Sequence, residues 1–132
     1  MKLMLDTNIC IDLIRDRPPS LLARLASHAV GDIGISVITL AELEYGVSKS
    51  GRPAKNREAL DLFASPLDVA PFERRATAVY GRLRAALEKK GQSIGSMDLL
   101  IAAHAVSLDV RLITHDVREF GRVPGLRLED WT

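Results

Sequence analysis

Short apolar segments alternate with helical segments along the whole chain, and this alternation restricts the choice of fold more than any other feature. The strand-like segments are rich in branched apolar residues and are bounded by turn-forming residues. They lie at 2–5, 33–38, 67–70 and 110–114, with a last one at 126–131 that is expected at an edge. Strands that alternate with helices predict an α/β fold with a mainly parallel sheet.

The segments between these strands carry apolar residues at helical spacing. Helices are predicted at 8–15, from a start at 18–20 through Leu25, and at 39–47, 57–63, 72–90 and 97–108. Asn8 or Thr7 is expected to cap the first helix, and Gly91 to close the longest one. The polar stretch 49–56 contains glycine and proline and is predicted to be a loop.

Length and composition predict one domain spanning residues 1–132. The chain is 47% hydrophobic, so it can bury a core, and its 18 basic residues nearly balance its 17 acidic ones. That balance argues against binding nucleic acid by overall charge alone.

Cys10 is the only cysteine, so no intramolecular disulfide can form. No export signal or membrane-spanning stretch is evident, and a cytoplasmic protein is expected.

Four acidic residues are expected at one edge of the predicted sheet. Asp6 ends the first strand, and Asp116 follows the strand that ends at Thr114. Glu42 is expected in the first turn of the helix after the second strand, and Asp98 in the first turn of a later helix. Ligands of open α/β sheets bind beyond the carboxyl ends of the strands. The four side chains are therefore predicted to line one crevice.

Carboxylates gathered in this way repel one another and resist ionising unless a cation is present. Mg²⁺, or Mn²⁺ in its place, prefers carboxylate and water ligands. Such an ion lowers the pKa of a bound water and neutralises charge on a phosphoryl oxygen. The pattern therefore favours hydrolysis of phosphodiester bonds.

Each acid also has a purely structural interpretation. Asp6 could serve as a turn residue or as a helix N-cap. Glu42 stands three residues after Thr39 and could form a capping box with it. Asp98 would favour the positive end of a helix, and Asp116 could be an ordinary loop acid.

Other polar residues fit the crevice less well. Glu44 is predicted to be solvated or to make a surface pair, and Glu119 is a candidate for the outer part of the site. For His115, a surface role is favoured over contact with a substrate phosphate.

Four blocks of sequence form a recognisable pattern by their order and spacing. They are MLDTN at 4–8, TLAELEYG at 39–46, IGSMDLLIAAHA at 94–105 and LITHD at 112–116. The last continues through REF at 118–120 and PGL at 124–126 to EDW at 129–131. In order and spacing they resemble a PIN-domain ribonuclease, specifically a VapC toxin of a type II toxin–antitoxin pair. The resemblance covers essentially the whole chain.

The resemblance implies a Rossmann-like, three-layer α/β/α sandwich and an endoribonuclease that depends on Mg²⁺ or Mn²⁺. It also implies a VapB-type antitoxin that blocks the site, and homodimers that pair again in the antitoxin complex. RNA is the implied substrate, with tRNA among the candidates, and no membrane is involved.

Residue roles follow from the same resemblance. Asp6, Glu42 and Asp98 match acidic positions that hold metal, whereas Asp116 matches a position that is Asp in some members and Asn in others. Thr7 and Thr114 match hydroxyl positions that support the acids, and Asn8 is grouped with them. The chain departs from many relatives at His115, where Asn is common.

The mechanism expected from these residues is attack of a metal-activated water on the scissile phosphate, which leaves a 5′-phosphate and a 3′-hydroxyl. One or two Mg²⁺ ions would be held by Asp6, Asp98 and Asp116, with Glu42 bound directly or through water. One alternative is a non-catalytic PIN-like module that binds RNA or protein. Another is a phosphoacceptor receiver domain, which would need paired acids after the first strand and a later lysine.

Overall fold

Five parallel strands form the central sheet of the computed structural model, which describes residues 1–131. The strands are β1 (Leu3–Leu5), β2 (Ile33–Ser36), β3 (Asp68–Ala70), β4 (Arg111–Ile113) and β5 (Leu128–Glu129). Their order in the sheet is β3-β2-β1-β4-β5, which places β5 at an edge as predicted.

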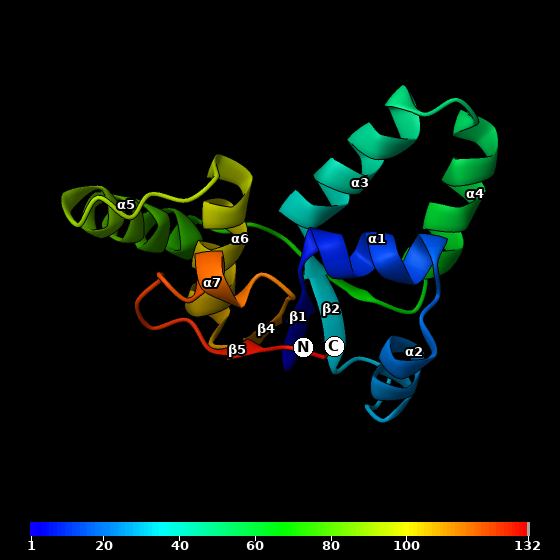
Figure 1. Cartoon of the computed structure of the whole chain (residues 1–132), viewed down its shortest axis with the longest axis horizontal. Helices are drawn as coiled ribbons and strands as arrows, with labels where there is room; N and C mark the ends of the chain where they lie inside the picture. Colours follow the sequence, from blue (N-terminus) through cyan, green and yellow to red (C-terminus); the bar gives the residue numbers. More distant parts are fainter. Residues whose placement is uncertain (132) are drawn as a thin grey trace.

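Helices cover both faces of this sheet (Figure 1). They are α1 (Thr7–Arg15), α2 (Pro19–Ala26), α3 (Val37–Lys49), α4 (Pro53–Ala64), α5 (Arg74–Lys89), α6 (Ser96–Leu108) and the single-turn α7 (Val117–Phe120). Within residues 1–131, none of these helices combines the length and apolarity needed to cross a membrane.

The strands separate two apolar cores because successive side chains point to opposite faces of a sheet. Leu3 and Leu5 pack with residues of α1 to α4, whereas Met4 packs with residues of α5 and α6. Leu112 of β4 joins the Met4 side, and Ile113 joins the Leu5 side. This arrangement confirms the three-layer α/β/α sandwich.

Several predicted boundaries were wrong, each because a cap or turn lies elsewhere. The second strand stops at Ser36, whose hydroxyl accepts a 3.0 Å hydrogen bond from the backbone N–H of Ile38 and so starts α3 early. Glu42 therefore lies in the second turn of α3 rather than the first. The helix α4 begins at Pro53, a residue type that favours a helix start, so the predicted loop is shorter.

The strand order reverses at β1, whose neighbours are β2 on one side and β4 on the other. A chain that winds outward in both directions leaves a crevice at this point, because the connections from the two strand ends diverge. Asp6 follows β1 and Asp116 lies three residues after the end of β4. The topology thus positions both acids at the mouth of one crevice.

Candidate active site

Asp6 is held by hydrogen bonds to both carboxylate oxygens. It is the N-cap of α1, and its Oδ1 accepts a 2.9 Å hydrogen bond from the N–H of Ile9. Its Oδ2 accepts a 2.5 Å hydrogen bond from the hydroxyl of Thr114. The predicted caps Asn8 and Thr7 were wrong, because Asp6 already occupies that position. Burial raises the pKa of Asp6, and these hydrogen bonds oppose the rise.

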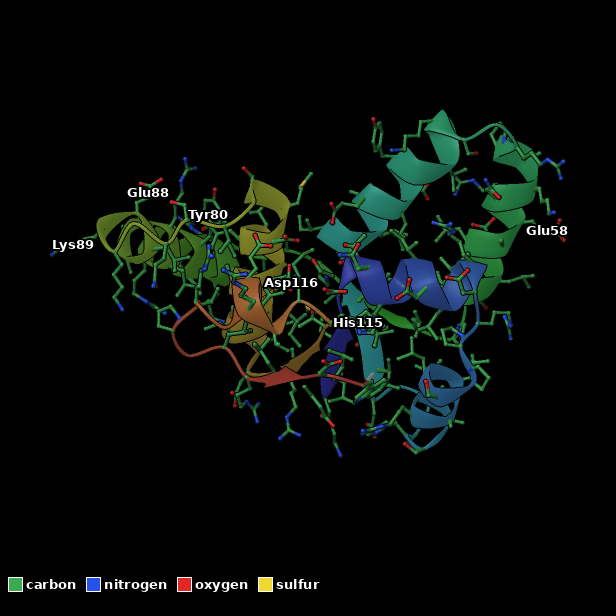
Figure 2. The ribbon with its side chains drawn as sticks, in the orientation of Figure 1. Glu58, Tyr80, Glu88, Lys89, His115 and Asp116 are labelled. Atoms are coloured by element: carbon green, nitrogen blue, oxygen red, sulfur yellow. The ribbon has the colours of Figure 1, made fainter. Side chains whose placement is uncertain are left out.

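Thr114 joins the ends of β1 and β4 through one hydroxyl. Besides donating to Asp6, its Oγ1 accepts a 3.0 Å hydrogen bond from the backbone N–H of Asp116. The Oδ1 of Asp116 accepts in turn from the N–H of Glu119 at 3.0 Å and caps α7. Figure 2 shows Asp116 beside α7. The loop after β4 is therefore fixed relative to Asp6.

Glu42 is oriented by a pair of threonines. The hydroxyl of Thr7 lies 2.6 Å from Oε1 of Glu42 and 3.2 Å from the hydroxyl of Thr39. A hydroxyl has one hydrogen, so Thr7 donates to the carboxylate and accepts from Thr39. The capping-box interpretation of Thr39 was therefore wrong, since its buried hydroxyl supports the site instead.

Asp98 lies in the first turn of α6, and its pKa is raised to about 6. Burial is the largest cause, because it penalises the charged form. The remaining causes are the negative charges of Glu119, Glu42, Asp6 and Asp116, in that order. The structure thus brings the other three predicted acids within electrostatic reach of Asp98.

Glu119, which was predicted for the outer part of the site and not among the four ligands, is a fifth acid near Asp98. Its Oε1 accepts a 2.9 Å hydrogen bond from the N–H of Gly95, the N-cap residue of α6. This contact ties α7 to the helix start that carries Asp98. The single turn of α7 was not predicted, and the clue to it was an Asp followed three residues later by a Glu.

A cleft of about 520 Å³ opens over three of the four predicted acids, and Asp116 is not part of its lining. Asp6, Glu42 and Asp98 lie in its wall, together with Thr7 and the exposed Asn8. Further residues of the same wall are Tyr45, Lys49 and Met97. The cleft is open to solvent and is bounded by α1, α3 and the start of α6.

His115 does not lie free at the surface. Its Nε2 is 3.0 Å from Oδ2 of Asp12, and its Nδ1 is 3.5 Å from Oδ1 of Asp130. Figure 2 places His115 near α1. Asp12 of α1 therefore contacts the residue next to Asp116. Glu44 pairs with Arg57, as expected for a surface residue.

The donor set suits a hard divalent cation, because carboxylate oxygens dominate it. Among the residues that the structure describes, no three His, Cys, Asp or Glu side chains come together closely enough to hold a metal ion by themselves. Mg²⁺ usually keeps several waters and binds through one or two carboxylates, so this spacing fits it. The raised pKa of Asp98 supports the same fit, since a cation would relieve the repulsion.

The family model of the PIN domain matches residues 3–126. The chain belongs to the PIN-domain family. Ribonuclease VapC2 of Rickettsia felis is 47% identical over 97% of this chain and 96% of its own length. The tRNA(fMet)-specific endonuclease VapC of Shigella flexneri is 42% identical over 100% of this chain and 99% of its own length. A DNA-bound VapBC structure from Salmonella typhimurium superposes with a TM-score of 0.97 at 40% identity, covering 100% of this chain and 99% of that one.

Within the PIN-domain family the chain is an endoribonuclease of the VapC toxin type. Nucleases of this family generally depend on a divalent metal ion. No observation in the structure or among these relatives favours a non-catalytic module or a receiver domain.

Proposed function

We propose that this endoribonuclease uses Mg²⁺, with Mn²⁺ as a substitute, at the site formed by Asp6, Glu42, Asp98 and Asp116. The observation that carries the proposal is the pKa of Asp98, raised to about 6 by burial and by the neighbouring carboxylates. Crowding of buried and partly buried acids does not stabilise the fold, so it marks a candidate site where a cation or substrate compensates for the repulsion.

Some of these side chains are proposed to bind the cation, and others to hold the ligands in position. Asp6 and Asp98 are the proposed direct ligands, and Asp116 and Glu42 bind directly or through water. When bound, the cation supplies a water of lowered pKa and neutralises phosphoryl charge. Thr114 holds Asp6, Thr7 holds Glu42, and Asn8 lines the cleft beside them. The expected products carry a 5′-phosphate and a 3′-hydroxyl.

The test is RNA cleavage by purified protein with Mg²⁺, compared with cleavage in a chelator. Asp6→Asn and Asp98→Asn should each abolish cleavage, because they remove a negative charge at nearly constant size. Both should also weaken Mg²⁺ binding in calorimetry, a measurement that does not depend on activity. Glu44→Gln is the matched control, since Glu44 is an acid of α3 that pairs with Arg57. Equal cleavage by wild type and both Asn variants would contradict the proposal.

We also propose a VapB-type antitoxin as the partner, because structures similar to this chain are VapBC assemblies. A groove of about 360 Å³ between α1, α3 and α4 suits a peptide of such a partner. It is lined by apolar residues such as Ile14 and Val47, and it shares Glu42 and Lys49 with the acidic cleft. A segment bound there would reach the site. Co-expression with a VapB-type antitoxin should yield a complex that is inactive on RNA.

Further proposals concern the substrate, the cellular compartment, the assembly and the domain organisation. The substrate is a tRNA, as the name of the Shigella relative states for that protein. The toxin acts in the cytoplasm as a homodimer that pairs again in the antitoxin complex, and residues 1–132 form its single domain. Light scattering of the free toxin and of the complex tests the assembly. Sequencing of RNA ends after brief expression, beside Asp98→Asn, tests the substrate.

A further inference from the structure

Two exposed apolar side chains border the acidic cleft on opposite walls. Tyr45 of α3 is 65% exposed and Met97 of α6 is 46% exposed, although both line the cleft. Exposed apolar groups gathered at a concave site indicate contact with a ligand. Neither side chain belongs to an apolar core, so folding does not explain them.

Lys49 lies one helical turn beyond Tyr45 and lines the same cleft. Its Nζ is 4.9 Å from the centroid of the Tyr45 ring, a cation–π contact. The ammonium covers one face of the ring, and the 65% exposure of Tyr45 shows that much of the remaining surface is open. An aromatic face and a cation thus stand side by side at the edge of the site.

The acids themselves make RNA binding difficult. Five carboxylates gather here, whereas the whole chain has a net charge of only +1. A phosphate chain approaching the cleft is therefore repelled wherever a cation does not neutralise the acids. Binding energy must come from contacts that do not depend on overall charge. Base stacking on an aromatic ring is such a contact, and it requires an unpaired base.

We propose that Tyr45 stacks against an unpaired base next to the scissile phosphate, with Lys49 binding the adjoining phosphate. Met97 packs against the same nucleotide from the opposite wall. This inference rests on the proposed function, because the four acids define where the scissile phosphate lies. It assigns to these residues the selection of an unpaired nucleotide, a role distinct from cleavage.

The experiment measures KM and kcat on a short RNA that the wild-type protein cleaves. Tyr45→Ala should raise KM about 5- to 150-fold, the usual effect of losing one stacked base, with little change in kcat. Tyr45→Phe is the matched control and should stay near wild type, because it keeps the ring. Lys49→Ala should reduce the slope of log KM against log salt by about 0.7, the value for one phosphate contact of a single strand.

A second RNA, with an abasic site in place of the stacked base, separates stacking from other effects. Tyr45→Ala should then change KM no further, since the partner of the ring is already missing. An unchanged KM for Tyr45→Ala on the intact RNA would overturn the inference. An equal rise in KM on the intact and the abasic RNA would also overturn it, because the ring would then act on something other than the base.

A fluorescent base at the same position gives a readout that needs no cleavage. In the Asp98→Asn background, 2-aminopurine should be quenched when Tyr45 is present and remain bright with Tyr45→Ala. Absence of quenching in both proteins would contradict stacking. Failure of the proposed function would look different: wild type would leave RNA intact, yet the quenching by Tyr45 would persist.

Discussion

The hydroxyl of Thr114 donates a 2.5 Å hydrogen bond to Oδ2 of Asp6, across the parallel pair of β1 and β4. The two residues are 108 positions apart in sequence, yet each directly follows its strand. The same hydroxyl accepts from the N–H of Asp116. One uncharged side chain therefore sets the relative positions of two proposed metal ligands.

Thr114→Val should lower activity about 10- to 100-fold, the usual effect of removing a residue that orients a metal ligand. Loss of this hydrogen bond also removes an effect that lowers the pKa of Asp6, so the pKa should rise further. The acid limb of the pH–rate profile should consequently move to higher pH. Thr114→Ser keeps the hydroxyl and should retain most activity. Wild-type activity in Thr114→Val would contradict this role of the hydroxyl.

Asp98→Asn should stabilise the protein at pH 8 when metal is removed by a chelator. The pKa of Asp98 is about 6 in the fold against an ordinary value of 3.8, so the fold favours the protonated form. The favourable contribution is complete below about pH 3.8 and is lost as pH rises through about 6. The gain in Tm should therefore appear at pH 8 and shrink at pH 4.5. Mg²⁺ at pH 8 should raise the Tm of wild type more than that of the variant.

Glu119→Gln should lower the pKa of Asp98, because the charge of Glu119 is the largest electrostatic contribution that raises it. The glutamine oxygen can still accept the hydrogen bond from Gly95, so the start of α6 should keep its position. NMR titration of carboxyl carbons in metal-free protein measures the shift. Glu119→Ala removes both the charge and the hydrogen bond and should also lower Tm. A pKa of Asp98 that is the same in wild type and Glu119→Gln would rule out this coupling.

Thr7→Val should weaken activity about tenfold through Glu42, whose Oε1 accepts the 2.6 Å hydrogen bond from Thr7. The buried hydroxyl of Thr39 would lose its partner as well, so a small loss of stability is expected. Thr7→Ser should behave like wild type in both respects. In a double variant with Glu42→Gln, the two effects should not add, because both changes act on the same carboxylate.

Gly34→Ala should destabilise the fold by about 1–3 kcal/mol, because the added methyl group overpacks the sheet. A Cβ at Gly34 would lie 2.3 Å from the carbonyl oxygen of Asp68 in the neighbouring strand β3. Gly46→Ala is the control within α3, where a Cβ meets nothing within 4 Å. That change should stabilise the protein by about 1 kcal/mol through helix propensity. Denaturant unfolding of the three proteins measures both values.

The sequence by itself determined the order of strands and helices, because apolar periodicity and turn residues are local signals. From that order, the positions of Asp6 and Asp116 at strand ends followed directly. Asp98 was placed correctly in the first turn of its helix. These predictions held because parallel α/β topology brings the carboxyl ends of strands to one edge, whatever the side chains between them.

Only the tertiary structure decided which groups support those acids. The bond from Thr114 to Asp6, the pair of Thr7 and Thr39, and the contact of Glu119 with Gly95 all join distant parts of the chain. Such contacts depend on strand register and helix packing to within about an ångström, which local patterns do not encode. The caps at Asp6 and Ser36 show the same limit, since several neighbouring residues had suitable chemistry and packing selected one of them.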